Sequence, residues 1–543
     1  MRKKLLTTAI TIAIIMTMNE MLEGKKLSYQ HHPNGTTYVY EVLERHWDKD
    51  KQQARNKQIC IGKLDPKTGD FIPSRRFSEQ GLAAGDASVS AVTTVWGPAL
   101  LLRQVDREIG LSAVLRKASP ELWRDILAMA WYIVITGQAL SNADLWLQQH
   151  ESPTEKLLSS QRISELLAKI DEEVRQTFFR LWGGALAKGD RLCYDITSVS
   201  SYAEQNEYVR WGYNRDKESL PQINLAMVYG QQSQLPVTYR ELSGSISDVR
   251  TLSNLLHQFD KLNYPKLHLV LDRGFYSKAN VDHLCRSGQH FTLAVPTHIN
   301  WVRLLIDQYR EIVDSPDGLH RTDAESVYAH TILYPWGESR RRCYAHLYYD
   351  AQRVADDRTR FDNQILDWEE ELLKEQLVPE HEEAYARFFT VKTTPKRGRR
   401  VTRNSKAILA ARKQYVGFTV ILTSKHKNPL ESLRIYREKD VVEKCFDDLK
   451  NTLDMKRLRV HRPAQMKGRL FIQFIALILL AQIRKTMRSR GLTPKYTARR
   501  LLMELESLTK IHYAGRYKDR FSELTKAQGE ILTAFGVDTT TLS

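Results

Sequence analysis

Cysteine is scarce in this chain, and no pattern pairs the few that occur. The five cysteines lie far apart and include no CxxC pair: Cys60, Cys193, Cys285, Cys343 and Cys445. A disulfide framework favours an even set in a secreted domain, and a zinc knuckle needs close spacing, so neither is indicated. We therefore expect a protein of a reducing compartment, the cytoplasm.

Long hydrophobic runs are also missing. The run from Leu5 to Met16 follows basic residues, as in a secretion signal, but no cleavage site follows it and it is too short to span a bilayer. Because further methionines stand close by, we expect translation to start later and residues 1–24 to be an atypical leader outside the native chain. The run from Phe471 to Ala481 contains Gln473 and is again too short, which predicts a buried helix. No membrane association is expected.

Acidic residues are too few to balance the basic ones. The 543 residues include 81 Lys and Arg against 64 Asp and Glu, a formal net charge of +17. Such an excess attracts polyanions and is typical of nucleic-acid binding. A basic enzyme whose charge only aids solubility, or a membrane-surface protein, would share it, so charge alone does not decide. The length predicts two to four domains.

From Gly189 onward the pattern alternates between short apolar strands and amphipathic helices. Three strands are followed by helix, strand, helix and strand, the order of an RNase H-like core, a mixed sheet covered by helices in the α+β or α/β class. The predicted elements are strands at 191–199, 222–229, 235–242, 266–271 and 291–295, with helices at 248–262 and 278–286. Before this core we expect a β-rich module and then a helical region, which could read DNA or simply pack.

A long segment interrupts the core. Between Lys392 and Lys413 it carries nine Lys or Arg and no acidic residue, a tract that either follows a phosphate backbone, which we favour, or is a solvated loop. The chain after the leader is thus predicted to divide as follows: 25–85 N-terminal β-rich module, 86–186 helical DNA-binding region, 187–299 first part of the core, 300–413 insertion domain, 414–490 second part of the core with the catalytic helix, and 491–543 C-terminal helical region.

Three carboxylates stand where phosphoryl transfer on DNA needs them. Asp195 is predicted to end the first core strand, Asp272 the fourth, and Glu443 lies on the helix after the interruption. Two Mg²⁺ ions about 3.5–4 Å apart would need such hard oxygen ligands on rigid elements. Each residue alone could be a turn or surface residue. Asp447, four positions after Glu443 on the same helical face, is an alternative to it.

The strand YDITS, the segment LDRGFYS and a helix with Tyr436, Lys439, Glu443 and Lys450 together resemble DDE transposases of the IS4 superfamily. The stretch from Asn34 to Pro66 resembles the IS1634-type group within it. The resemblance covers about residues 25–490. Its third-carboxylate helix has Tyr, Glu and Lys at this spacing, which selects Glu443 over Asp447. Lys439 stands where the family usually has Arg, so a point charge replaces a bidentate fork.

The resemblance implies an RNase H-like core, dependence on two Mg²⁺ or Mn²⁺ ions, and cut-and-paste DNA transposition. It implies terminal inverted repeats and target DNA as partners, a homodimer in a synaptic complex, and a place at the nucleoid. Tyr436, Lys439 and Lys450 share a predicted helix face with Glu443 and would contact DNA, as would Arg273. The alternatives are a nuclease without strand transfer and a catalytically silent DNA-binding repressor.

One aromatic residue is predicted to receive a base flipped out of the strand end. In relatives with a β-rich insertion an aromatic side chain there has this role, and stacking offsets the cost of flipping. Trp336, in a turn-like Tyr-Pro-Trp-Gly sequence, is our candidate. Trp301 and Trp368 are alternatives, and any of the three could instead be a core residue.

Overall fold

The computed structural model describes most of the chain in two compact units. The described residues are 25–32, 35–48, 53–65, 71–74, 91–203, 206–246, 248–322, 325–338, 340–394, 398–413, 415–513 and 519–539. The predicted leader lies outside them. One unit comprises Met1–Thr93 with Ile511–Arg520, and the other Thr94–Lys510 with Phe521–Ser543.

The smaller unit contains an antiparallel sheet in the order β1-β2-β3-β4. Its strands are β1 (Leu27–His31), β2 (Thr37–Asp48), β3 (Gln53–Leu64) and β4 (Phe71–Pro73). Val39 and Ile61 are buried on one face, where Leu27, Leu64 and Phe71 pack against them. This is the β-rich module that the alternation of apolar residues predicted.

The larger unit opens with helices that surround one long helix. They are α3 (Gly97–Ile109), α4 (Leu111–Ala118), α5 (Trp123–Thr136), α6 (Ala143–Gln149), α7 (Ser160–Lys169) and α8 (Glu172–Leu186), around α17 (Pro463–Ser489). By length and composition α17 could cross a membrane, but 89% of its apolar window is buried inside the protein. The buried helix predicted over Phe471–Ala481 is therefore confirmed. Gly468 lets α17 approach α7, since a Cβ there would lie 2.0 Å from the Leu167 carbonyl oxygen.

The central sheet contains the five predicted strands, in the predicted order along the chain. Its first five strands are β6 (Arg191–Ser201), β7 (Gln222–Gly230), β8 (Pro236–Ser243), β9 (His268–Leu271) and β10 (His290–Val295). They lie in the order β8-β7-β6-β9-β10, with β6, β7 and β8 antiparallel and β9 parallel to both β6 and β10. The first strand therefore sits in the middle beside the fourth, which confirms the RNase H-like core.

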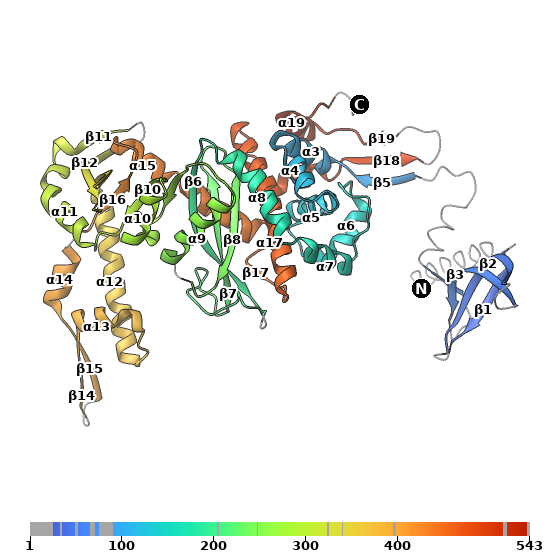
Figure 1. Cartoon of the computed structure of the whole chain (residues 1–543), viewed down its shortest axis with the longest axis horizontal. Coiled ribbons are helices and arrows are strands. Elements are labelled where there is room, and N and C mark those ends of the chain that lie inside the picture. The colour runs from blue at the N-terminus through green and yellow to red at the C-terminus, as the bar shows by residue number, and fades with distance from the viewer. Residues whose placement is uncertain are drawn as a thin grey trace, which may run out of the picture. The chain divides into compact units, whose positions relative to one another are not determined.

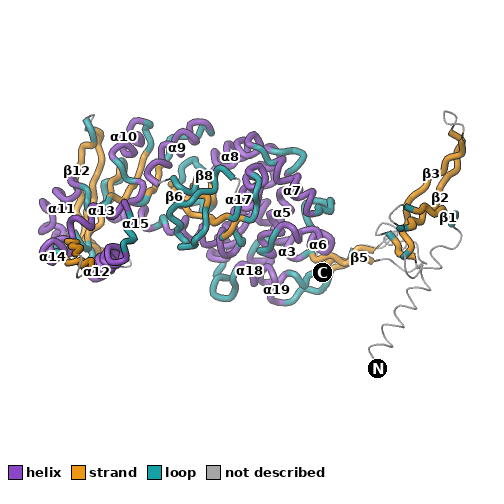
Figure 2. Tube along the Cα trace, turned by 90° about the horizontal axis from the view of Figure 1, so that it is seen from below, coloured by secondary structure: helices purple, strands orange, loops and turns teal. Residues whose placement is uncertain are grey.

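Successive residues of a strand in this sheet lie on opposite faces, and each face is buried in a different core. Tyr194 and Ile196 pack in one core with α9 (Asp248–Lys261) and α10 (Lys278–Arg286), whereas Cys193 and Val199 pack in another with α8 and α17. Figure 2 shows α9 and α10 along one side of the strands. Both faces are therefore covered, as the apolar runs of β6 and β7 require.

The sheet continues beyond the predicted core boundary. β16 (Phe418–Thr423) pairs with β10, and β13 (Arg341–Tyr349), β12 (Ser326–Trp336) and β11 (Leu319–Arg321) follow outward. The interruption therefore supplies three strands of the core sheet, next to which packs α11 (Asn300–Val313). The alternation in sequence could not show that these strands join the same sheet.

The rest of the interruption forms a separate arm. It contains α12 (Ala351–Lys374), α13 (Glu382–Phe388), β14 (Phe389–Thr394), β15 (Gly398–Arg403) and α14 (Ser405–Lys413). Figure 1 shows α12 leading away from the sheet toward the β14–β15 hairpin. Ile365, Leu372 and Phe388 belong to its own small core. Part of the basic tract is neutralised here, because Arg399, Arg403 and Arg412 pair with glutamates and an aspartate of α12 or its cap.

The chain then returns to the core through short elements. They are α15 (Pro429–Arg437), α16 (Asp440–Asp447), the π-helical turn η5 (Asp448–Thr452) and β17 (Arg457–Leu458), which pairs in parallel with β6. After α17 come α18 (Ala498–Leu505), β18 (Thr509–Tyr513), β19 (Arg520–Phe521) and α19 (Lys526–Ala534). A further, three-stranded sheet has the order β19-β18-β5, with β5 at Ala91–Val95.

We expect Gly468→Ala to lower the free energy of unfolding by about 1–3 kcal/mol, because its Cβ would overlap the backbone of α7. Denaturant unfolding measures the change. The matched control is Gly184→Ala in α8, where the described residues leave 4 Å of free space around the added Cβ. There the better helix propensity of alanine should stabilise by up to ~1 kcal/mol. Equal effects at both positions would contradict the close approach.

Candidate functional site

The two predicted aspartates lie side by side on parallel strands. Tyr194 of β6 is in register with Leu271 of β9, so the next residues along are Asp195 and Asp272. β9 ends there, and the Asp272 side chain accepts a hydrogen bond of 2.8 Å from the Arg273 N–H, opening the turn η2 (Arg273–Phe275). β6, however, runs on to Ser201, so the prediction that Asp195 ends its strand was wrong. Pairing with β7 carries β6 past the point where β9 stops.

The helical residues approach these aspartates from α15 and α16. The Tyr436 hydroxyl donates to Asp272 Oδ1 at 2.5 Å. Lys439 Nζ donates to Glu443 Oε1 at 3.1 Å and lies 4.0 Å from Asp272 Oδ2. The Lys439 side chain is 16% exposed, whereas those of Asp272 and Glu443 are 41% and 59% exposed. One ammonium group therefore stands between carboxylates of the sheet and of the helix.

The electrostatics of the site show a shortage of positive charge. Burial raises the pKa of Asp195 to about 6, and the negative charge of Asp272 adds to this rise. The hydrogen bond from the Ile196 N–H and the positive charges of Arg215 and Lys439 act in the opposite direction. Burial tends to lower the pKa of Lys439, but the nearby Asp272, Glu443 and Asp195 raise it overall. Lys439 thus stays charged and partly offsets carboxylate repulsion.

The donor set suits a hard divalent cation. Asp195, Asp272 and Glu443 offer only carboxylate oxygens, the ligands that Mg²⁺ and Mn²⁺ prefer. In the described part of the chain no three His, Cys, Asp or Glu side chains converge closely enough to form a metal cage. Instead, Asp272 and Glu443 lie within 4.0 Å of the Lys439 ammonium, while Asp195 accepts a hydrogen bond from the Ile196 N–H. The chemistry of the three carboxylates fits the metal, although two of them face a lysine here.

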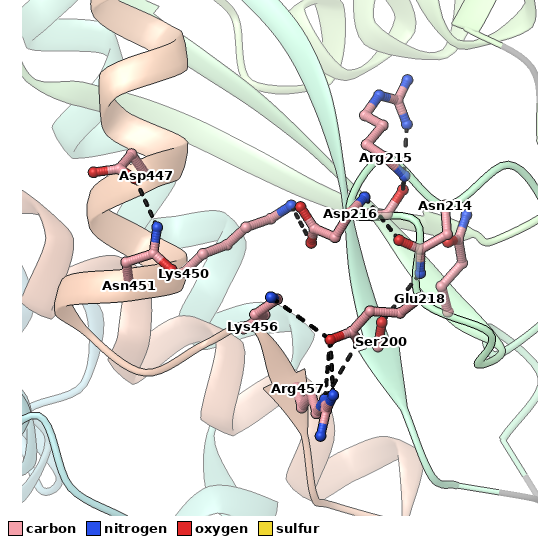
Figure 3. Close-up of polar contacts among 12 residues, drawn as sticks. Ser200, Asn214, Arg215, Asp216, Glu218, Asp447, Lys450, Asn451, Lys456 and Arg457 are labelled. Carbon is pink, nitrogen blue, oxygen red and sulfur yellow. Dashed lines mark hydrogen bonds and ion pairs between the residues drawn. The ribbon is translucent and has the colours of Figure 1, made fainter.

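Among the described residues, Asp447, the alternative third carboxylate, has only a local hydrogen-bond partner. Its Oδ1 accepts a hydrogen bond of 2.7 Å from Asn451 Nδ2, one helical turn away (Figure 3). Glu443, by contrast, shares Lys439 with Asp272. These contacts favour Glu443, and its catalytic role stays a prediction.

Lys450 does not share an open face with Glu443. It lies in the π-turn η5, which breaks the three/four spacing assumed for a continuous helix, and it is 9% exposed. Its Nζ pairs with Asp216 Oδ2 at 2.6 Å. The prediction of a common face was therefore wrong for Lys450, and a DNA contact by it stays a prediction.

The partner segment, Asn214–Glu218, was missed by the sequence analysis. Figure 3 shows Asn214 pointing toward Ser200 at the end of β6, Asp216 toward Lys450 of η5, and Glu218 toward Arg457 of β17, whereas Arg215 points away from them. Beside the Lys450 pair, Glu218 accepts from Arg457 Nη2 at 3.0 Å, and Arg215 Nη2 donates to both oxygens of Asp248 at 2.7 and 2.8 Å. A loop has no periodicity, so only the charged residues themselves could have signalled it.

The remaining predicted DNA contacts lie in different surroundings. Arg273 is exposed beside Asp272, as a phosphate contact requires, and stays a prediction. Trp336 is 5% exposed, and its Nε1 donates to Asp282 Oδ1 at 2.7 Å. It is a core side chain here and presents no open face for a base. The sequence analysis missed Trp211 and Tyr213, which are 67% and 80% exposed just before Asn214.

Comparison with known proteins identifies the family of the chain. The family model "Transposase DDE domain" matches residues 187–479, more than half of the chain, so the chain belongs to this family of transposases. No relative among the curated proteins matched. A solved structure of the piggyBac transposase synaptic complex with hairpin DNA is similar at 10% identity and a TM-score of 0.35, covering 74% of this chain and 70% of that one.

We expect Asp216→Asn to lower the free energy of unfolding by about 1–3 kcal/mol, because it leaves the Lys450 ammonium buried without its carboxylate. Lys450→Met combined with it should recover part of that loss. Denaturant unfolding of the two single variants and the double variant gives the coupling energy, with the exposed Asp447→Asn as control. A coupling near zero would contradict a structural ion pair.

Proposed function

We propose that the chain is an active DNA transposase that cleaves at the ends of an insertion sequence and joins the freed 3′ hydroxyls to target DNA. The observation that carries this proposal is that Asp195 and Asp272 lie side by side on neighbouring strands, with Glu443 linked to Asp272 through Lys439, in a chain of the transposase DDE family. The IS4 superfamily and its IS1634-type group remain our proposed placement within that family.

The residues of the site have distinct tasks in this proposal. Two Mg²⁺ or Mn²⁺ ions, when bound, would activate the attacking oxygen and neutralise the leaving one. Asp195 and Asp272 would hold them from rigid neighbouring strands, and Glu443 from the facing helix. Tyr436 orients Asp272 through its hydrogen bond. Lys439 keeps the carboxylates together before the metal binds. It must then withdraw toward a DNA phosphate, and the Glu443 rotamer must adjust.

The proposed partners follow from the reaction. Both element ends must be brought together before cutting, so we propose a homodimer bound to two terminal inverted repeats and then to target DNA. The net charge of +17 favours association with DNA, which would place the protein at the nucleoid in the cytoplasm.

We expect Glu443→Gln to abolish Mg²⁺-dependent cleavage of a labelled terminal-repeat duplex while DNA binding persists, because one metal ligand is lost. A fall of at least about a thousandfold in rate is expected from losing such electrostatic stabilisation. Asp447→Asn is the matched control and should cut nearly normally. If Asp447→Asn is instead the inactive variant, the third carboxylate is misassigned.

The same assay separates the alternatives. Binding without cutting in either Mg²⁺ or Mn²⁺ would favour a DNA-binding repressor over a transposase. Cutting without joining to a target duplex would favour a nuclease.

We expect Lys439→Met to bind Mn²⁺ about fivefold more tightly, since its ammonium no longer competes for Asp272 and Glu443, both partly exposed. Without metal the same variant should melt at a lower temperature, because the carboxylates lose their counter-charge, and Mn²⁺ should restore it. Calorimetric titration and thermal unfolding measure the two effects, with the exposed Lys444→Met as control. Weaker Mn²⁺ binding by Lys439→Met would contradict the competition.

A further inference from the structure

A second site lies where the helical region faces the segment after η5. A cavity of about 810 Å³ is bounded on one side by η1 (Leu140–Asn142) and α7, and on the other by residues 454–462 and the start of α17. Ile163, Leu167 and Leu458 give it an apolar floor. It is separate from the carboxylates of the candidate catalytic site, none of which lines it.

One wall of the cavity holds a buried guanidinium group with an unsatisfied nitrogen. Arg469 of α17 lines the cavity and is 9% exposed, and its Nη1 has no hydrogen-bond partner among the described residues. Burial lowers the pKa of Arg469 to about 10, against the favourable charges of Asp454 and Tyr132, so the group is still protonated at neutral pH. A buried guanidinium is costly unless it is paired. An anion in the cavity would supply the missing partner.

The rim of the cavity is mostly basic, and Asp454 is the one acidic residue among those that line the cavity. The seven residues from Lys456 to Arg462 include four Lys or Arg, one His and no acidic residue. Arg459, His461 and Arg462 are exposed and line the cavity, whereas Arg457 is already paired with Glu218. A row of exposed cations beside a half-apolar cavity complements a sugar–phosphate chain, whose charge repeats along its length.

Strand β6 connects the wall of the cavity with the candidate catalytic site. β17, which forms part of its wall, pairs with Ser200 and Ser201 of β6, and Asp195 stands five residues earlier on β6. At about 3.3 Å per strand residue that separation is roughly 17 Å, or about five base-pair steps of duplex DNA. DNA whose end reaches Asp195 could therefore reach this cavity within half a helical turn.

We propose that this cavity, the Arg469 groove, binds the sugar–phosphate backbone of the terminal DNA a few base pairs from the cleavage position. Arg469 contacts a phosphate inside the groove, and Arg459 and Arg462 contact the backbone at its rim. This inference rests on the proposed function, since it names where the substrate of that reaction is held.

The test is fluorescence anisotropy of a labelled terminal-repeat duplex with the full chain in EDTA, so that no cleavage intervenes. We expect Arg469→Met and the rim variant Arg459→Gln/Arg462→Gln each to weaken binding by about tenfold. The rim variant should also reduce the salt dependence, with a slope shallower by about one for each phosphate that the protein no longer neutralises. Arg500→Gln, an exposed charge removed elsewhere on α18, is the matched control and should bind nearly as the native chain does.

If both groove variants bind DNA as tightly as Arg500→Gln does, the proposed DNA contact in the groove is wrong, while the proposed reaction still stands. Met is chosen because it fills much of the volume of a buried Arg. Thermal unfolding checks that Arg469→Met is folded, and if it is not, the DNA affinity of the exposed rim variant tests the groove.

A second experiment adds inorganic phosphate. If phosphate stabilises the native chain but not Arg469→Met while the two bind DNA equally, the groove holds a small anion and the proposal is wrong. Failure of the native chain to bind DNA would overturn the proposed function itself.

Discussion

The repulsion among the carboxylates of the candidate site is the constraint that its surrounding structure must overcome. Asp195 and Asp272 are held next to each other because β6 and β9 are neighbouring parallel strands. Glu443 is brought to Asp272 by α16, the Lys439 ammonium lies close to both of these carboxylates, and the charge of Asp195 acts on Lys439 as well. A site with more negative than positive charge costs folding energy, which the buried sheet and helices around it must supply, and a bound cation relieves that cost.

The parts that hold Glu443 in place come from distant segments. The π-turn after α16 buries Lys450 against Asp216, and Glu218 pairs with Arg457 on β17, so the loop before β7 is tied to the chain on both sides of the turn. Behind these contacts α17 is buried along almost its whole length against α5 and α7. The helical region therefore has a packing role beside the sheet, and the Arg469 groove lies where the two meet.

Local patterns were enough for much of the core. Strands such as β6 and β7 are apolar runs in the sequence because both of their faces are buried, and α17 was predicted as a buried helix because its polar residues are few. The helix carrying Tyr436 and Glu443 was less regular than its spacing indicated. It breaks at Lys439 between α15 and α16 and passes into a π-turn at Asp448. Backbone irregularities of this kind depend on tertiary contacts, which spacing does not record.

The sequence by itself determined the kinds of element, their order and the residue types able to bind a hard cation, because periodicity and side-chain chemistry are properties of the chain. It also carried the motif spacing that marked Asp195, Asp272 and Glu443. Only the tertiary structure decided that the interruption extends the core sheet through β11, β12 and β13, that Trp336 is a core residue, and that Arg469 lines a cavity with its Nη1 unsatisfied. Those outcomes depend on which distant segments pack together, and packing follows from the summed burial of the whole fold rather than from any local pattern.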